Sequence, residues 1–293
     1  MTDTIRRPLS GRWVRLLFLL SFISSCVNLD HITRFTGEAS ESLAKAGEVQ
    51  FSFTEFCRLY QEEVLSGKLQ TDIQPLPEPD CLLFQRSDSA LAFLNAVETN
   101  YLLALHNLAG KDLVNYKTDA LVKGANSLSS QLKWNVTADQ VKSGGNILAM
   151  LMNEAVRAWS AEKLKQYIRK NGQDFSNVSD AYINGLRALS GECTLALVNY
   201  KLFYSNALLE GTKDPSVKAL IVKDYRQMES VLSGKKNTVE RFAQMVDTVK
   251  TGYALLTQSV DRLTIDELKT ALSDYASKLQ GMRSEFNKIE HKN

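Results

Sequence analysis

Long stretches without proline are the feature that most limits how this chain can fold. Of its five prolines, Pro8 stands near the start, three fall within QPLPEPD at residues 74–80, and Pro215 follows Asp214. Proline removes a backbone donor and clashes with the preceding helical turn, so its absence elsewhere is typical of long, uninterrupted α-helices. Asp214-Pro215 itself has the pattern of a helix cap followed by a proline in the first turn.

Apolar residues recur at steps of three and four along the chain, which is the period of an amphipathic helix face. One such stripe runs from Ile32 to Val64 and predicts a single first helix. Another, from Leu268 to Ile289, predicts the last. TADQ at 137–140 has the form of a capping box that opens a helix, and RKNG at 169–172 has the form of its end. Further helices are expected at about 87–109, 112–130, 177–210 and 215–262, the last interrupted near SGKK at 233–236.

No segment shows the strict alternation of a half-buried strand, so the predicted fold class is all-α. At 1.5 Å per residue, helices of about 30 residues are roughly 45 Å long. We therefore expect an elongated antiparallel bundle of roughly five to seven long helices.

The first 26 residues have the pattern of a secretory signal. Four arginines, the last of them Arg15, precede or interrupt a short apolar core from Trp13 to Ile23. That core is shorter than the roughly 18 apolar residues typical of a membrane-spanning helix. It ends in ISSC, a branched apolar residue and two small residues before Cys26, which resembles the lipobox of bacterial lipoproteins.

This resemblance implies cleavage before Cys26 and a diacylglycerol joined to its sulfur, with a further acyl chain on the new amino group. Residues 1–25 are then a signal peptide, 26–30 a lipidated N-terminus with a short tether, and 31–293 a single helical domain. Two or three acyl chains give stable membrane attachment, whereas one does not. Because Val27 rather than Asp follows the cysteine, the resemblance implies the outer membrane, facing the periplasm, or the outer face of the plasma membrane in a Gram-positive source. An uncleaved N-terminal anchor is the alternative.

Removal of residues 1–25 changes the formal net charge from +2 to −1, because four arginines leave with a single acid, Asp3. A near-neutral chain lacks the basic surface of a nucleic-acid binder. No nucleic-acid partner is expected.

Secretion would place the chain in an oxidising compartment, where disulfides persist. We predict a disulfide between Cys57 and Cys81, which would attach the proline-rich segment to the bundle. Cys193 lies on the apolar side of its helix and is expected to be a free, buried thiol. His31 and His291 are expected in flexible tails, and His106 at the edge of the core with a hydrogen-bond partner.

Motifs of catalysis and of metal or nucleotide binding are absent from the sequence: there is no HExxH, CxxC, GxxxxGK[ST] or GxSxG. We therefore assign no catalytic, cofactor or metal residue, and do not expect an enzyme. Two apolar runs, NILAMLM at 146–152 and LALVNYKLFY at 195–204, are too short to be stored membrane segments and are expected in the core. The loop at 68–80 is either a plain connection or a contact for a partner.

These features favour a lipid-anchored envelope protein that binds another macromolecule as an adaptor, tether or assembly factor, held to the membrane through Cys26 and bound to an unidentified protein. Three alternatives remain. They are a periplasmic immunity or inhibitor protein against an exported effector, an enzyme or carrier that handles lipid or peptidoglycan, and a helical pore-former.

Overall fold

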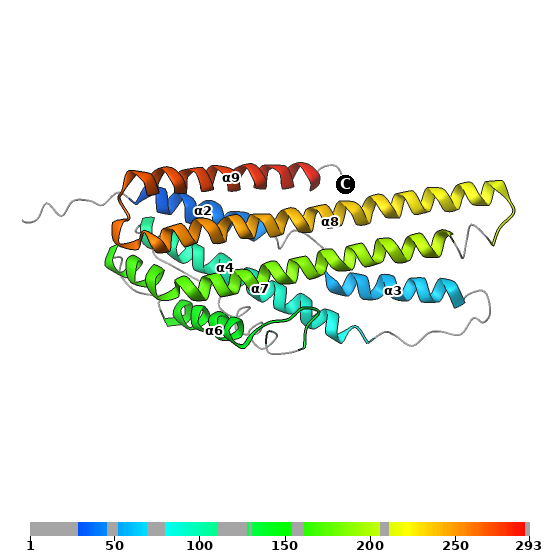
Figure 1. Ribbon diagram of the computed structural model, residues 1–293, viewed down its shortest axis with the longest axis horizontal. Helices are drawn as coiled ribbons and strands as arrows, with labels where there is room; N and C mark the ends of the chain where they lie inside the picture. Colours follow the sequence, from blue (N-terminus) through cyan, green and yellow to red (C-terminus); the bar gives the residue numbers. More distant parts are fainter. Residues whose placement is uncertain are drawn as a thin grey trace, which may run out of the picture.

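The fold is an elongated bundle of α-helices (Figure 1). The computed structural model describes residues 29–45, 52–68, 80–110, 128, 131–153, 161–205 and 211–290, with side chains left out at 61–68, 153, 161 and 287–290. Within these residues there are seven α-helices and no strand. The predicted all-α class is confirmed. The helices are α2 (Asp30–Ala44), α3 (Phe53–Lys68), α4 (Leu82–Gly110), α6 (Ala138–Asn153), α7 (Ala161–Leu202), α8 (Pro215–Gln258) and α9 (Asp266–Glu290), with a short 3₁₀ turn, η4 (Val260–Arg262), between the last two.

The two longest helices, α7 and α8, form an antiparallel hairpin on which other helices of the bundle pack. Helices α4 and α6 pack on α7, α9 packs on α8, and α2 lies between α4 and α9. The Asp180 carboxylate pairs with Lys250 at 2.6 Å, and the Ser190 hydroxyl donates to Glu240 at 2.9 Å. Together these contacts fix the register of the hairpin, in which residue 199 of α7 lies level with residue 231 of α8.

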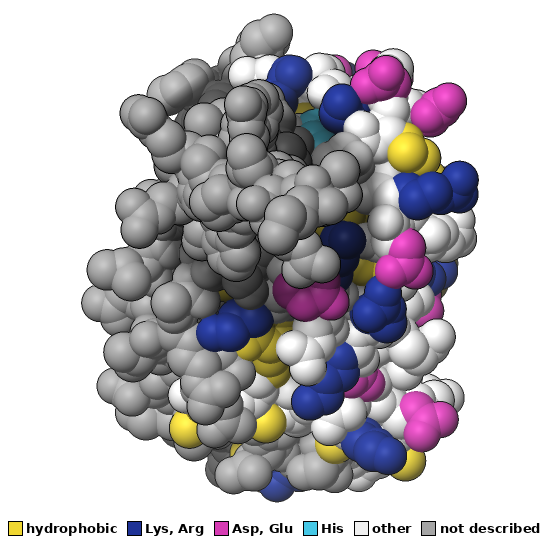
Figure 2. Space-filling model, turned by 90° about the vertical axis from the view of Figure 1, so that its left-hand side faces the viewer, with side chains coloured by type: hydrophobic (Ala, Val, Ile, Leu, Met, Phe, Trp, Pro, Cys, Tyr) yellow, Lys and Arg dark blue, Asp and Glu magenta, His cyan; other side chains and the backbone are white. Residues whose placement is uncertain are grey.

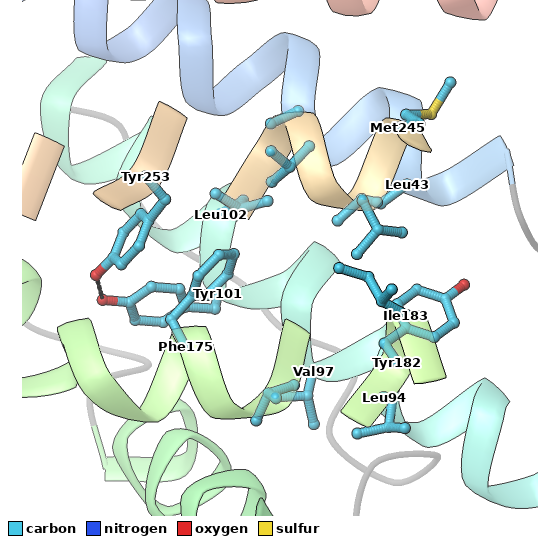
Figure 3. Packing of buried hydrophobic residues seen from close by; sticks show 14 of the residues in the cluster. Leu43, Leu94, Val97, Tyr101, Leu102, Phe175, Tyr182, Ile183, Met245 and Tyr253 are labelled. Carbon is cyan, nitrogen blue, oxygen red and sulfur yellow. Dashed lines mark hydrogen bonds between the residues drawn. The ribbon is translucent and has the colours of Figure 1, made fainter. Parts of the chain in front are cut away.

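Aromatic rings from three helices meet in the core of the bundle (Figure 3). Tyr101 of α4, Phe175 of α7 and Tyr253 of α8 are fully buried or nearly so, with ring centroids 4.2–5.7 Å apart. The two tyrosine hydroxyls are 2.6 Å apart and hydrogen-bonded to each other. The backbone carbonyl of Tyr167 lies 3.2 Å from the Tyr101 hydroxyl and can accept the remaining proton. Three helices are thus joined by ring packing and by satisfied polar groups in a dry interior.

Two predicted helix boundaries are wrong. The single helix predicted from Ile32 to Val64 is divided into α2 and α3. The start of α3 is capped from within and from α4: Ser52 accepts from the Glu55 amide, and Asp88 accepts from the amides of Phe53 and Thr54. These bonds satisfy donors that a helix start leaves unpaired, and so favour a new helix here.

The helix end predicted at RKNG is also absent, because α7 continues through Gly172 for another 30 residues. A Cβ atom added to Gly172 would lie 2.6 Å from Cγ2 of Thr257. The glycine therefore permits close approach of α8 and is not a helix stop. The break expected near residues 233–236 is likewise absent from α8. By contrast, the capping box is confirmed by reciprocal bonds between Thr137 and Gln140, at 2.9 and 3.2 Å, as is the Asp214 cap before Pro215.

Candidate functional site

The distal part of the α7–α8 hairpin projects beyond most of the bundle. We call this part the arm and define it as residues 190–205, which include the end of α7 at Leu202, and residues 215–232 of α8. Among the described helices only α3 lies beside it, along α7 (Figure 1). The 44 residues of α8 correspond to a length of about 66 Å at 1.5 Å per residue. The arm therefore presents side chains far from the end at which α2 begins.

Polar contacts from α3 and from the segment before α6 hold the base of the arm. Glu192 of α7 is buried, and its carboxylate accepts from the Tyr60 hydroxyl at 2.8 Å and pairs with Lys133 at 2.6 Å. Lys235 of α8 pairs with Glu55 of α3. The hydrogen-bonding capacity of this buried carboxylate is satisfied by a cation and a hydroxyl donor. Because these partners come from other segments, the cluster fixes the position of the arm.

The outward face of α7 in the arm is apolar. Leu195, Val198 and Leu202 follow the i, i+3, i+7 spacing of one helix face and are 49–54% exposed. We call these three side chains the α7 stripe. On the opposite side of the same helix, Cys193 and Ala196 are fully buried. The arm segment of α7 therefore has two apolar faces, and only one of them is covered by the described residues.

Helix α8 adds exposed apolar side chains to the arm at Val217, Leu220 and Val231. Within the described residues, six of the eight large hydrophobic side chains that are exposed belong to the arm. Isolated exposed apolar residues are ordinary on protein surfaces, but a concentration of them on one element is typical of an interaction site.

A shallow groove adjoins the α7 stripe on its α8 side. It has a volume of about 290 Å³ and is lined by Leu186, Arg187, Ser190, Gly191, Thr194, Lys236, Glu240 and Ala243. Gly191 and Thr194 are exposed on the outward side of α7, Gly191 one turn before Leu195 and Thr194 directly before it. A Cβ atom placed on Gly191 would meet nothing within 4 Å, so the backbone there is open to an approaching group.

This surface was not predicted from the sequence. LALVNYKLFY was assigned to the core, and the structure divides it. Tyr200 is buried and stacks on Tyr204, which also packs against Tyr225 of α8. Leu195, Val198 and Leu202 are exposed. Eight of the ten residues in this run are apolar or aromatic, whereas one buried stripe requires only about half, and this excess is a signal that both faces need a partner.

Cysteines 57 and 81 are joined, in agreement with the predicted disulfide, with Cα atoms 5.9 Å apart. Cys193 is free and buried, also as predicted. Burial raises the pKa of its thiol to about 11. A thiol with a raised pKa is a poor nucleophile at neutral pH, so Cys193 is a core residue.

The histidine predictions have mixed outcomes. His106 donates through Nδ1–H to the Thr33 carbonyl at 2.8 Å, consistent with the expected edge position. His31 was expected in a flexible tail, and that prediction is wrong. It is buried, and its Nε2 lies 2.7 Å from the Leu263 carbonyl, which ties the start of α2 to the α8–α9 connection. Cys26, His291 and most of the loop at 68–80 lie outside the described residues.

The part of the chain that the structure describes contains no group of three or more His, Cys, Asp or Glu side chains placed to bind a metal ion. None of the helices in those same ranges combines the length and the apolar character needed to cross a bilayer. Within the described chain, the arm is thus the strongest candidate for a functional surface. Comparisons of the chain with protein-family models, with curated proteins and with solved structures gave no match in any of the three.

Proposed function

We propose that this chain is a lipid-anchored protein of the bacterial cell envelope that binds another protein through its arm, as an adaptor or assembly factor. The observation that carries the proposal is the α7 stripe: three large apolar side chains on one helix face, half exposed, at the end of a braced projection. Burying such a stripe against a partner would remove apolar area from water, which is the main driving force of association.

The arrangement of the ends supports a role as a tether. Leu29, three residues after Cys26, packs in the core beside the first turn of α2. That turn lies at the opposite end of the long axis from the arm (Figure 1). A lipid on Cys26 would hold one end of the molecule at the membrane and leave the arm free to reach a partner.

The surface at the anchor end differs from the arm. Acidic and basic side chains are interspersed over its described part, with hydrophobic atoms in small, scattered areas (Figure 2). A mixed-charge surface of this kind favours solvation over partner binding. The partner contact is therefore assigned to the arm.

Binding is favoured over catalysis by the shape of the groove. A substrate site is usually a deep pocket of 300–1,000 Å³ with converging polar groups. The groove beside the α7 stripe, of about 290 Å³, lies at the lower limit of that range and is open to solvent rather than enclosed. The inhibitor function is compatible with the same surface, since its partner would be an exported effector.

Site-specific photo-crosslinking in intact cells tests the proposal. A photoreactive phenylalanine analogue replaces Val198, and the matched control carries it at Gln166, which is exposed on the bundle half of the same helix. We expect a discrete protein adduct from position 198 and at most a small fraction of that yield from 166. Equal yields, or no protein adduct from either position, would reject the arm as the binding surface.

The lipid anchor is tested separately by labelling with a fatty-acid analogue. Cys26→Ser should remove the label and leave the precursor uncleaved. Label that persists on the Cys26→Ser protein would exclude lipidation at this residue.

A further inference from the structure

We propose that the partner presents an amphipathic α-helix whose apolar stripe is accompanied by acidic side chains. This helix packs along α7 from Arg187, one turn before the arm, to Lys201 within it. The inference rests on the function proposed above and specifies the chemistry of the partner. It is carried by the shape of the stripe and groove and by the charges beside them.

The shape of the surface matches a helix. From Gly191 to Leu202 the outward face of α7 is about 17 Å long at 1.5 Å per residue, or three turns. Partner helices pack with axes 8–10 Å apart, and side chains of one helix fill the spaces between those of the other. The α7 stripe supplies the protruding side chains, and the groove at Gly191 supplies open space for one side chain of the partner.

The charges on this part of α7 are of one sign. Between residues 187 and 202 the charged side chains are Arg187, Glu192 and Lys201. Glu192 is buried and paired with Lys133, so the exposed charges are both basic. Arg187 and Lys201 stand near the two ends of the stripe, about 21 Å apart along the helix. Neither forms an ion pair with a described residue.

Charges on the neighbouring helix are mixed beside the stripe and more basic towards the start of α8. In the groove, Lys236 lies 3.9 Å from Glu240, whose carboxylate also accepts from Ser190. At the start of α8 the arm exposes Lys218, Lys223 and Arg226. The acids of the same segment are Asp224 and Glu229, and Glu229 accepts from the Tyr225 hydroxyl at 3.0 Å. An acidic helix is therefore complementary to the arm, and a basic one is repelled.

The same charges argue against a second copy of this chain as the occupant. If a second copy of this chain packed stripe against stripe, Arg187 and Lys201 would face their own equivalents in a parallel pair and each other in an antiparallel pair, which places like charges together.

Charge reversal of the full-length protein tests the inference. The variant Arg187→Glu with Lys201→Glu is compared with Lys170→Glu with Lys278→Glu, which makes the same change in net charge at exposed positions of the bundle. Both carry the photoreactive residue at position 198. We expect the adduct yield to fall at least tenfold in the arm variant and to be unchanged in the control. The crosslinked partner peptide should contain apolar residues at i, i+3 or i+4 and i+7 with Asp or Glu beside them.

A reciprocal change in the partner distinguishes lost charge pairing from loss of folding in the arm variant. Replacing the acids of the identified partner segment by Lys should restore the adduct with the arm variant and weaken it with the unchanged protein. If the arm variant keeps the full adduct yield, the acidic helix is rejected while the binding function stands. Adducts of phospholipid or of a second copy would reject it in favour of those occupants. Absence of any adduct above that of position 166 would reject both proposals.

Discussion

The two halves of the α7–α8 hairpin belong to the same helices but differ in what they expose. In the bundle half of α7 the exposed side chains are polar, among them Gln166, Lys170 and Asn184, whereas in the arm they include Leu195, Val198 and Leu202. Helix α8 shows the same change, with polar or small exposed residues after Leu232 and Val217, Leu220 and Val231 before it.

This difference has a physical reason in the number of neighbours available. The bundle half is covered by α4, α6 and α9, and its apolar residues are used in that core. Among the described helices only α3 packs against the arm. It covers one face of α7, so only part of the apolar residues of α7 are buried there. A hairpin that needed no partner would have polar residues at the remaining positions, as its bundle half does. The contrast thus separates what holds the fold from what is available for binding.

Leucine truncation should give the largest difference between the two halves. Leu102 is fully buried in α4, and Leu102→Ala should lower the free energy of unfolding by about 2–5 kcal/mol because it removes packing and leaves a cavity. Leu202→Ala in the arm should change it by no more than about 0.5 kcal/mol. Urea unfolding measures both. A large loss at Leu202 would mean that the arm face is part of the core, contrary to the structure.

The second prediction concerns Glu98, a carboxyl group enclosed in the bundle half. It is fully buried on α4. Burial raises its pKa to about 8, Asp180 adds to the rise, and Ser179 and Lys250 oppose it. The folded state therefore retains a proton on this group that the unfolded state has released above pH 4.5.

Stability should consequently be greatest, as far as Glu98 is concerned, below pH 4.5 and should fall as the pH rises to about 8. At about 1.4 kcal/mol per pKa unit the loss between pH 5 and 8 is on the order of 4 kcal/mol. Glu98→Gln keeps the shape and removes the titration, so the difference between variant and unchanged protein should shift in favour of the variant as pH rises. If the free energies of unfolding of Glu98→Gln and the unchanged protein differed by the same amount at pH 5 and at pH 8, the raised pKa would be contradicted.

Sequence reasoning predicted the part of the molecule that depends on local pattern. Helix positions follow from apolar spacing, and the caps at Thr137 and Asp214 follow from residue type at a helix start. It failed where a residue's role depends on a distant segment. Gly172 has the composition of a helix end, yet its role is set by Thr257, 85 positions away, and Ser52 begins a helix with help from Asp88 of α4.

The candidate site was hidden for the same reason. Whether an apolar side chain is covered depends on how many helices surround its segment. The periodicity of one helix does not give the number of its neighbours. Arg187 and Lys201 are likewise ordinary surface charges in the sequence. They become informative only when Glu192 between them is seen to be buried against Lys133.

A third, smaller effect is expected from the disulfide, which attaches α3 beside the arm. Cys57 and Cys81 are 24 positions apart, and the chain-entropy account of such a closure gives about 3 kcal/mol. Cys57→Ala with Cys81→Ala should be destabilised by about this amount, and a reducing agent should have no further effect on it. Non-reducing peptide mapping checks the pairing: a bond from either residue to Cys193 would contradict the structure.

The smallest effect compares two tyrosine hydroxyls, one at the base of the arm and one within it. Tyr60 donates to the buried carboxylate of Glu192 at 2.8 Å, whereas Tyr225 donates to the exposed Glu229 at 3.0 Å. Removing a donor from a buried carboxylate costs about 1–2 kcal/mol, because water cannot replace it, so Tyr60→Phe should lower the free energy of unfolding by that amount. Tyr225→Phe should change it by about 0.3 kcal/mol or less, since solvent satisfies Glu229. Chemical unfolding of the two variants side by side resolves the difference. Equal effects would show that the base is as open to water as the arm, and that the arm is not held in place by the Glu192 cluster.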